Sequence, residues 1–220
     1  MDSGELTPST RMAGETCRVF LNLSFSTLVK DGPNASIGPV NTFCRQIRAR
    51  STEHRAAIGA LRSAPGQMVS ILRQELDSMI RVIFLLAQKD RGYRNELIEA
   101  AVSGKAWTAR GTRRKITDRD MVELANKLHG WTRSVYQFGC GFIHLSSLHD
   151  YRDRDPLAQI SEEEREAILE HLRSYHGGPL NPSPTFDDIV PLLPKVFEKI
   201  ASNLECYLRQ IEGNEVDPTL

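Results

Sequence analysis

The sequence predicts an all-α protein with a four-helix-bundle core and additional N-terminal helices. Apolar residues recur at helical spacing in nearly every segment of the 220-residue chain, and the alternation typical of strands is almost absent. Capping residues and helix breakers separate these segments. We therefore expect one all-helical domain over residues 1–220, with an N-terminal helical extension at 1–63 and the bundle core at 66–212.

Four helices are expected in the first half of the chain. The first, 9–30, ends at the sequence DGP, and the second, 39–63, ends at the sequence SAPGQ, because proline and glycine interrupt helices. The third, 67–90, carries apolar residues at alternating steps of three and four, and a short helix at 92–104 follows it.

Three further helices are expected in the second half. Thr117 or Asp118 caps the fifth, which runs to about residue 145. Ser161, followed by three glutamates, forms the capping box of the sixth, which ends at the sequence GGP. The last helix begins near Pro184 and carries a buried stripe up to Ile211.

The fifth helix is expected to be the centre of the bundle. Its apolar residues step by three and four without a break, and Gly139 and Gly141 flank this seam. Glycine costs about 1 kcal/mol in a helix, so we interpret these two positions as places where a neighbouring helix approaches closely. The seam consists of Met121, Leu124, Leu128, Trp131, Val135, Phe138, Phe142 and Leu145.

A polar stripe lies away from the seam of the same helix. At about 100° per residue, His144 falls in line with Arg133, Gln137 and Cys140, on a face directed to solvent, a partner subunit or a ligand. The stripe predicts a homodimer, because a mixed polar surface suits a two-fold contact. An ordinary surface histidine is the alternative for His144.

Positive charge is concentrated locally in a chain whose net charge is zero; residues 45–62, for example, hold five arginines against one acid. The 28 basic and 28 acidic residues balance, so no overall field directs the protein to nucleic acid or membrane. Residues 105–119 nevertheless hold six cations against one acid. Arginine and lysine bind phosphates and tryptophan stacks on bases, so a nucleic-acid site is predicted here; the alternative is a solvated loop that pairs with acidic residues. The candidates are Trp107, Arg110, Arg113, Arg114 and Lys115.

Several classes of protein do not fit the sequence. No apolar run reaches the length of a membrane span, and the N-terminus lacks the basic start of a secretion signal, so a cytoplasmic protein is expected. The four cysteines form no CxxC pair, and His144 and His149 are badly spaced for a shared metal ion. With no nucleotide-binding or metalloprotease motif present, neither a metal nor a cofactor is predicted.

Two stretches, SILRQELDSMIRVIFLL and YQFGCGFIHLSS, resemble the HEPN superfamily over about residues 66–150. The resemblance implies a four-helix bundle, dimerisation and, in active members, metal-independent RNA cleavage by an arginine and a histidine that are separated by four to six residues. If His144 is that histidine, Gln137, Phe138 and Gly139 occupy the positions of the arginine. Arg133 lies about 16 Å away along the helix, too far to replace it within one chain.

Two other pairs, Arg48 with His54 and Arg165 with His171, match the spacing of this motif. Two matches are about the number that chance predicts for a chain of this composition. We therefore predict a HEPN-like binding or regulatory module without an intact RNase motif, linked to toxin–antitoxin or phage-defence systems, with RNA or a protein as its partner. One alternative is a metal-independent ribonuclease with an atypical site at His144 and Arg133. A purely structural homodimer is the other.

Overall fold

The computed structural model of the chain describes residues 38–213. Within this part, helices joined by turns account for the regular structure, apart from one isolated bridge between Thr108 and Lys115. The all-α prediction is confirmed for the described residues. The helix expected at 9–30 lies outside them.

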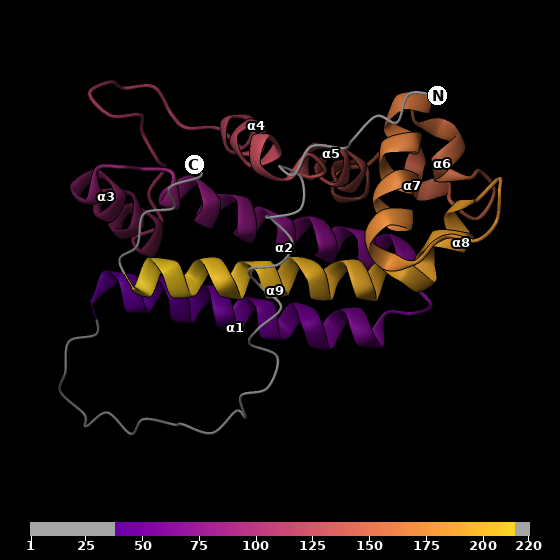
Figure 1. Cartoon of the computed structure of the whole chain (residues 1–220), viewed down its shortest axis with the longest axis horizontal. Helices are drawn as coiled ribbons and strands as arrows, with labels where there is room; N and C mark the ends of the chain where they lie inside the picture. The colour runs from indigo at the N-terminus through magenta and orange to yellow at the C-terminus, as the bar shows by residue number, and fades with distance from the viewer. Residues whose placement is uncertain (1–37, 214–220) are drawn as a thin grey trace, which may run out of the picture. The chain divides into compact units, whose positions relative to one another are not determined.

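Three long helices run side by side in Figure 1: α1 (Pro39–Ala60), α2 (Pro65–Leu86) and α9 (Leu193–Glu212). α2 is buried over most of its surface, because α9 covers one side of it and α4 and α5 cover another. The central position that the sequence analysis assigned to the fifth helix therefore belongs to α2.

α1 shares this core, although the sequence analysis placed residues 39–63 in an extension. The helix packs against α2, α3 and α9. Its apolar side chains Phe43, Cys44 and Ile58 are buried in the same cluster as those of α2 and α9. Part of the expected extension is thus a wall of the core itself.

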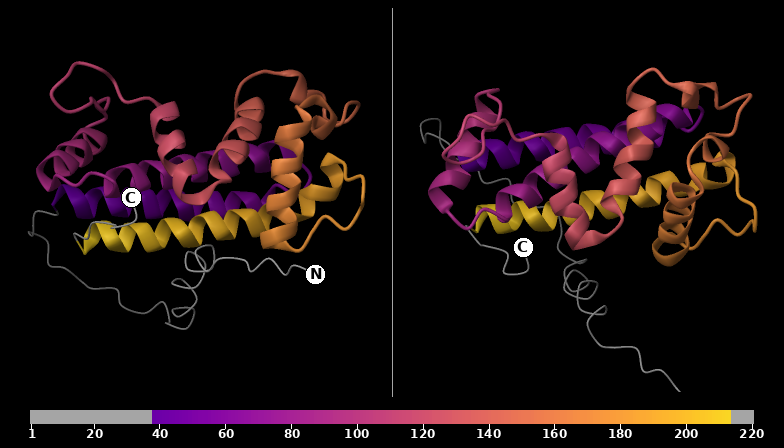
Figure 2. Two further views of the ribbon diagram at one scale, coloured as in Figure 1. Left: turned by 45° about the horizontal axis from the view of Figure 1, so that its top comes forward. Right: turned by 90° about the horizontal axis from the view of Figure 1, so that it is seen from above.

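The expected fifth helix is two helices, α4 (Asp118–His129) and α5 (Thr132–Ile143), which diverge above α2 in Figure 2. Of the two predicted caps, Thr117 or Asp118, the structure has Thr117, which forms a capping box with Asp120. α4 ends at Gly130, whose φ of 73° is a left-handed conformation that glycine adopts readily. The continuous seam was therefore wrong, and its last residue, Leu145, is 96% exposed.

Shorter elements complete the described residues. α3 (Arg91–Val102) packs against α1, and α7 (Glu162–His176) packs against α5 and α9. α7 begins at the predicted capping box of Ser161 and ends at Gly177 in a left-handed conformation. The remaining elements are η3 (Ser147–Asp150), α6 (Pro156–Gln159), α8 (Phe186–Ile189) and η4 (Val190–Leu192).

The two glycines of α5 lie where other side chains approach the helix backbone. A Cβ atom at Gly139 would lie 2.6 Å from the Cβ of Arg73 on α2, and one at Gly141 would meet Leu148 of η3. The Cβ of Arg73 is fixed to the backbone of α2, so it moves only if the whole helix moves. The expected close approach of a neighbouring helix is confirmed at Gly139, whereas Gly141 accommodates the side chain of Leu148 from the turn that follows α5.

Replacing Gly139 with alanine is expected to lower the free energy of unfolding by about 1–3 kcal/mol, because α5 must move away from α2. Gly59, in the last turn of α1, has nothing within 4 Å of an added Cβ, so it serves as the matched control. Gly59→Ala should raise stability by up to about 1 kcal/mol through helix propensity. Urea unfolding of both variants checks this, and a higher midpoint for Gly139→Ala would refute the close-approach argument.

Candidate functional site

The basic segment between α3 and α4 folds as a hairpin, which we call the basic hairpin (residues 105–116). The backbone N–H of Ile116 donates to the carbonyl of Trp107 at 3.0 Å, and that of Ala109 donates to the carbonyl of Arg114 at 2.8 Å. Gly111, with a φ of 67°, turns the chain at the tip. In Figure 1 this connection extends away from the helices, and most of its side chains, apart from the buried Trp107, are exposed to solvent.

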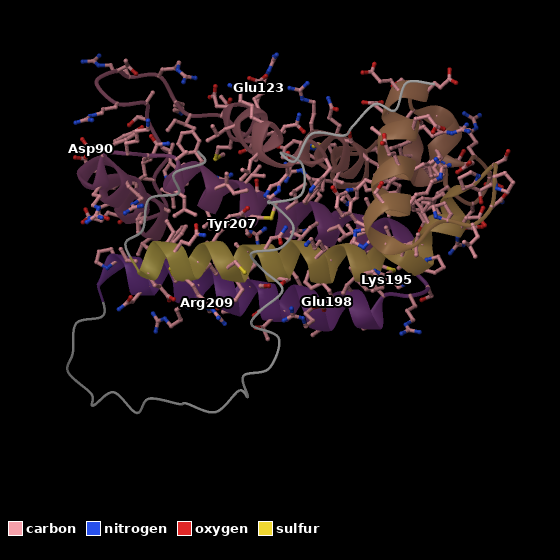
Figure 3. All side chains as sticks on the ribbon, viewed as in Figure 1. Asp90, Glu123, Lys195, Glu198, Tyr207 and Arg209 are labelled. Atoms are coloured by element: carbon pink, nitrogen blue, oxygen red, sulfur yellow. The ribbon has the colours of Figure 1, made fainter. Side chains whose placement is uncertain are left out.

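The cations of the basic hairpin fall into two groups. Arg110 forms an ion pair with Asp90, labelled in Figure 3, at 2.5 Å, and Arg114 pairs with Asp120 at 2.9 Å. These two arginines are therefore partly neutralised by nearby residues. The other group is exposed and forms no ion pair with any residue in 38–213; its members are Lys105, Arg113 and Lys115.

Trp107, expected to stack on a base, instead anchors the basic hairpin to α2. Its ring stacks on Phe84 with centroids 5.8 Å apart, and the guanidinium of Arg81 lies 5.8 Å from the ring centroid. Only 6% of the residue is exposed. No face of the indole is open to a nucleotide in this structure, so the nucleic-acid role of Trp107 is corrected to a structural one.

A groove lies between α3 and the basic hairpin; we call it the hairpin groove. Its volume is about 470 Å³, and it is lined by Tyr93 and Glu96 on α3 and by hairpin residues 108–113. The hydroxyl of Tyr93 donates to the carbonyl of Thr108 at 2.7 Å, which joins the two walls. Sequence reasoning missed this groove because α3 carries no basic cluster of its own.

His144 and Arg133 are not brought together. His144 is the residue that ends α5, in an extended conformation, and Arg133 lies in the first turn of the same helix. Both are exposed, and the rise of an α-helix separates them by about 16 Å along its axis. Of the predicted polar stripe, Gln137 is also exposed, whereas Cys140 is half-buried.

The two other arginine–histidine pairs serve the packing of helices. Arg48 forms ion pairs with Glu205 and Glu212 of α9, at 2.9 and 2.5 Å. His54 Nδ1 lies 2.7 Å from the carboxylate of the fully buried Glu75 on α2. In the other pair, the ring of His171 packs on Trp131 with centroids 4.9 Å apart. These contacts join α1 to α2 and α9, and α7 to the α4–α5 turn.

A closed ring of five side chains braces α4 and α5 on α2. The guanidinium of Arg73 lies 3.3 Å from the ring centroid of Tyr136, whose hydroxyl donates to Asp118 at 3.2 Å. Arg81 donates to Asp118 at 2.9 Å and to Asp77 at 3.0 Å, and Asp77 lies 3.5 Å from Arg73. Burial raises the pKa of Tyr136 to about 12, so the phenol stays protonated and keeps donating. The two arginines and two aspartates of this ring balance, so it leaves no net charge to attract an anion.

Three histidines on α4 and α7 are shielded from solvent: His129 is half-buried, and His171 and His176 are buried. The Nε2 atom of His129 lies 2.8 Å from the hydroxyl of Tyr207, labelled in Figure 3. His171 packs on His176 with ring centroids 5.2 Å apart. Burial, reinforced by the nearby ammonium of Lys199, lowers the pKa of His129 to about 4, and it lowers that of His171 to about 4 as well. All of these imidazoles are therefore neutral at physiological pH.

Residues 38–213 contain no cluster of three side chains suited to a metal ion, and none of their helices is long and apolar enough to span a bilayer. Comparison with protein-family models, with curated proteins and with solved structures finds no match to this chain. The candidate site therefore rests on its own geometry, an exposed basic hairpin beside a polar groove.

Proposed function

We propose that this protein is a HEPN-like module that binds single-stranded RNA without cleaving it. In this proposal α1, α2, α9 and the α4–α5 pair correspond to the four-helix-bundle core. The observation that carries the proposal is the basic hairpin with its three exposed, unpaired cations Lys105, Arg113 and Lys115. Flexible single strands adapt to such a surface, because phosphate contacts require charge and access but no fixed register.

The arrangement around His144 favours binding over cleavage. In-line attack by a 2′-hydroxyl needs a base near that hydroxyl and a cation for the charge that develops on phosphorus. His144 offers an exposed imidazole, but Arg133 lies at the other end of α5. An atypical ribonuclease, the second candidate, would need an arginine from another copy of the chain, so it would require the predicted homodimer. A regulatory role in a toxin–antitoxin or phage-defence system fits a module that binds RNA and leaves it intact.

The proposal predicts that RNA binding depends on the unpaired cations of the hairpin. Wild type should bind a fluorescent single-stranded RNA at low salt, and Arg113→Ala with Lys115→Ala should weaken binding. Losing two phosphate contacts should reduce the slope of log Kd against log salt concentration by about 1.4, at about 0.7 per contact for single strands. Arg45→Ala is the control, since Arg45 is an exposed cation of α1 without an ion pair among the described residues.

The same samples separate binding from cleavage. With a chelator present, wild type and His144→Ala should both leave the RNA intact over hours. Cleavage by wild type that disappears in His144→Ala would establish the ribonuclease instead. Unchanged salt slopes in the hairpin variant, or no binding by wild type even at low salt, would refute the proposed module.

A further inference from the structure

The hairpin groove brings three unlike chemical groups together. Tyr93 and Glu96 lie one turn apart on α3 and therefore face the same wall, while Arg113 lines the opposite side. The hydroxyl of Tyr93 is held by the carbonyl of Thr108, which fixes the ring at the wall. A volume of about 470 Å³ lies within the range of about 300–1,000 Å³ found for small-molecule sites.

The two charged groups of the groove lack partners. Glu96 and Arg113 are both exposed, and neither forms a hydrogen bond or ion pair with a residue in 38–213. Arg110, which also lines the groove, is different because it is paired with Asp90. A ligand that fits must therefore present hydrogen-bond donors to a carboxylate and an anion to a guanidinium. A phosphate alone does not fit, because Glu96 would repel it.

A nucleotide meets both requirements, and the carboxylate distinguishes among the bases. Guanine presents N1–H and an exocyclic amino group side by side, which suits the two oxygens of one carboxylate. Adenine and cytosine present a single amino group beside acceptors. Uracil presents one N–H between two carbonyls, which a carboxylate repels.

We propose that the hairpin groove holds one guanine nucleotide of a single-stranded RNA, with Glu96 reading the base and Arg113 binding its phosphate. The ring of Tyr93 supplies the apolar surface against which the base lies, because Trp107 is buried and does not contact the base. This inference rests on the RNA-binding function proposed above and adds a base preference to it.

The test compares labelled heptamers of uridine with heptamers that carry one central guanosine, by fluorescence anisotropy on the full chain. Wild type should bind the guanosine heptamer about tenfold more tightly, as expected for one bidentate contact to a base. Inosine, which lacks the exocyclic amino group, should lose most of this preference. Glu96→Gln should reduce it to about twofold or less without weakening the binding of the uridine heptamer.

Glu99→Gln is the matched control, because Glu99 is an exposed glutamate of the same helix outside the groove, and it should keep the full preference. Equal binding of both heptamers by wild type would overturn the guanine site and leave the RNA-binding function standing. Preference retained in Glu96→Gln would overturn it too, since the base would then be read elsewhere. Binding of neither heptamer would refute the proposed function itself, and the guanine site with it.

Discussion

Replacing Phe142 with alanine is expected to lower the free energy of unfolding by about 3–5 kcal/mol. Phe142 is 3% exposed and lies where α5 meets α2 and α8. Its ring centroid is 5.3 Å from that of Phe138 and 5.5 Å from that of Phe186, so truncation removes contacts on several sides. The loss of stability is large because the surrounding side chains are fixed on α2, α5 and α8 and cannot move together to fill the resulting cavity.

Urea unfolding, followed by circular dichroism, measures this loss. The neighbouring residue provides the control: Ile143 is 42% exposed, and Ile143→Ala should change the free energy of unfolding by less than about 1 kcal/mol. If Phe142→Ala unfolded at the same urea concentration as wild type, the aromatic contacts between α5 and α8 would not form in solution.

Lowering the pH from 7.5 to 5 is expected to reduce the free energy of unfolding by about 2–4 kcal/mol. Burial holds the pKa of His129 and of His171 at about 4 in the folded protein, against about 6.5 for an exposed imidazole. Between these values the unfolded chain binds protons that the folded protein does not bind. The stability that these two neutral histidines contribute is therefore fully present above pH 6.5 and is lost as the pH falls towards 4.

Two comparisons test this pH dependence. The double variant His129→Gln and His171→Gln should unfold with much less change between pH 7.5 and 5, whereas His144→Gln should behave as wild type, because His144 is exposed. Carboxylates contribute little in this window, since their ordinary pKa values lie near 4. Equal stability of wild type at both pH values would contradict the burial of the histidines. If the double variant lost as much stability as wild type between pH 7.5 and 5, the pH dependence would belong to other groups.

Helix boundaries that depend on local chemistry were predictable from the sequence. Thr117, Ser161 and Gly177 lie at the expected ends of α4 and α7, because each acts on backbone groups only a few residues away. The break at Gly130 was not predictable from periodicity. α4 and α5 both pack against α2, so the apolar pattern continues in phase across the turn that separates them.

Some features of the candidate site could likewise be predicted from the sequence, and others depended on the tertiary structure. The sequence by itself determined that residues 105–116 carry exposed cations, because uncompensated charges remain in water, and that Arg133 and His144 lie far apart on a helix. Only the tertiary structure decided that Asp90 neutralises Arg110 and that Phe84 covers Trp107. These contacts join segments distant in the chain, and their geometry depends on how α2, α3 and the basic hairpin pack together.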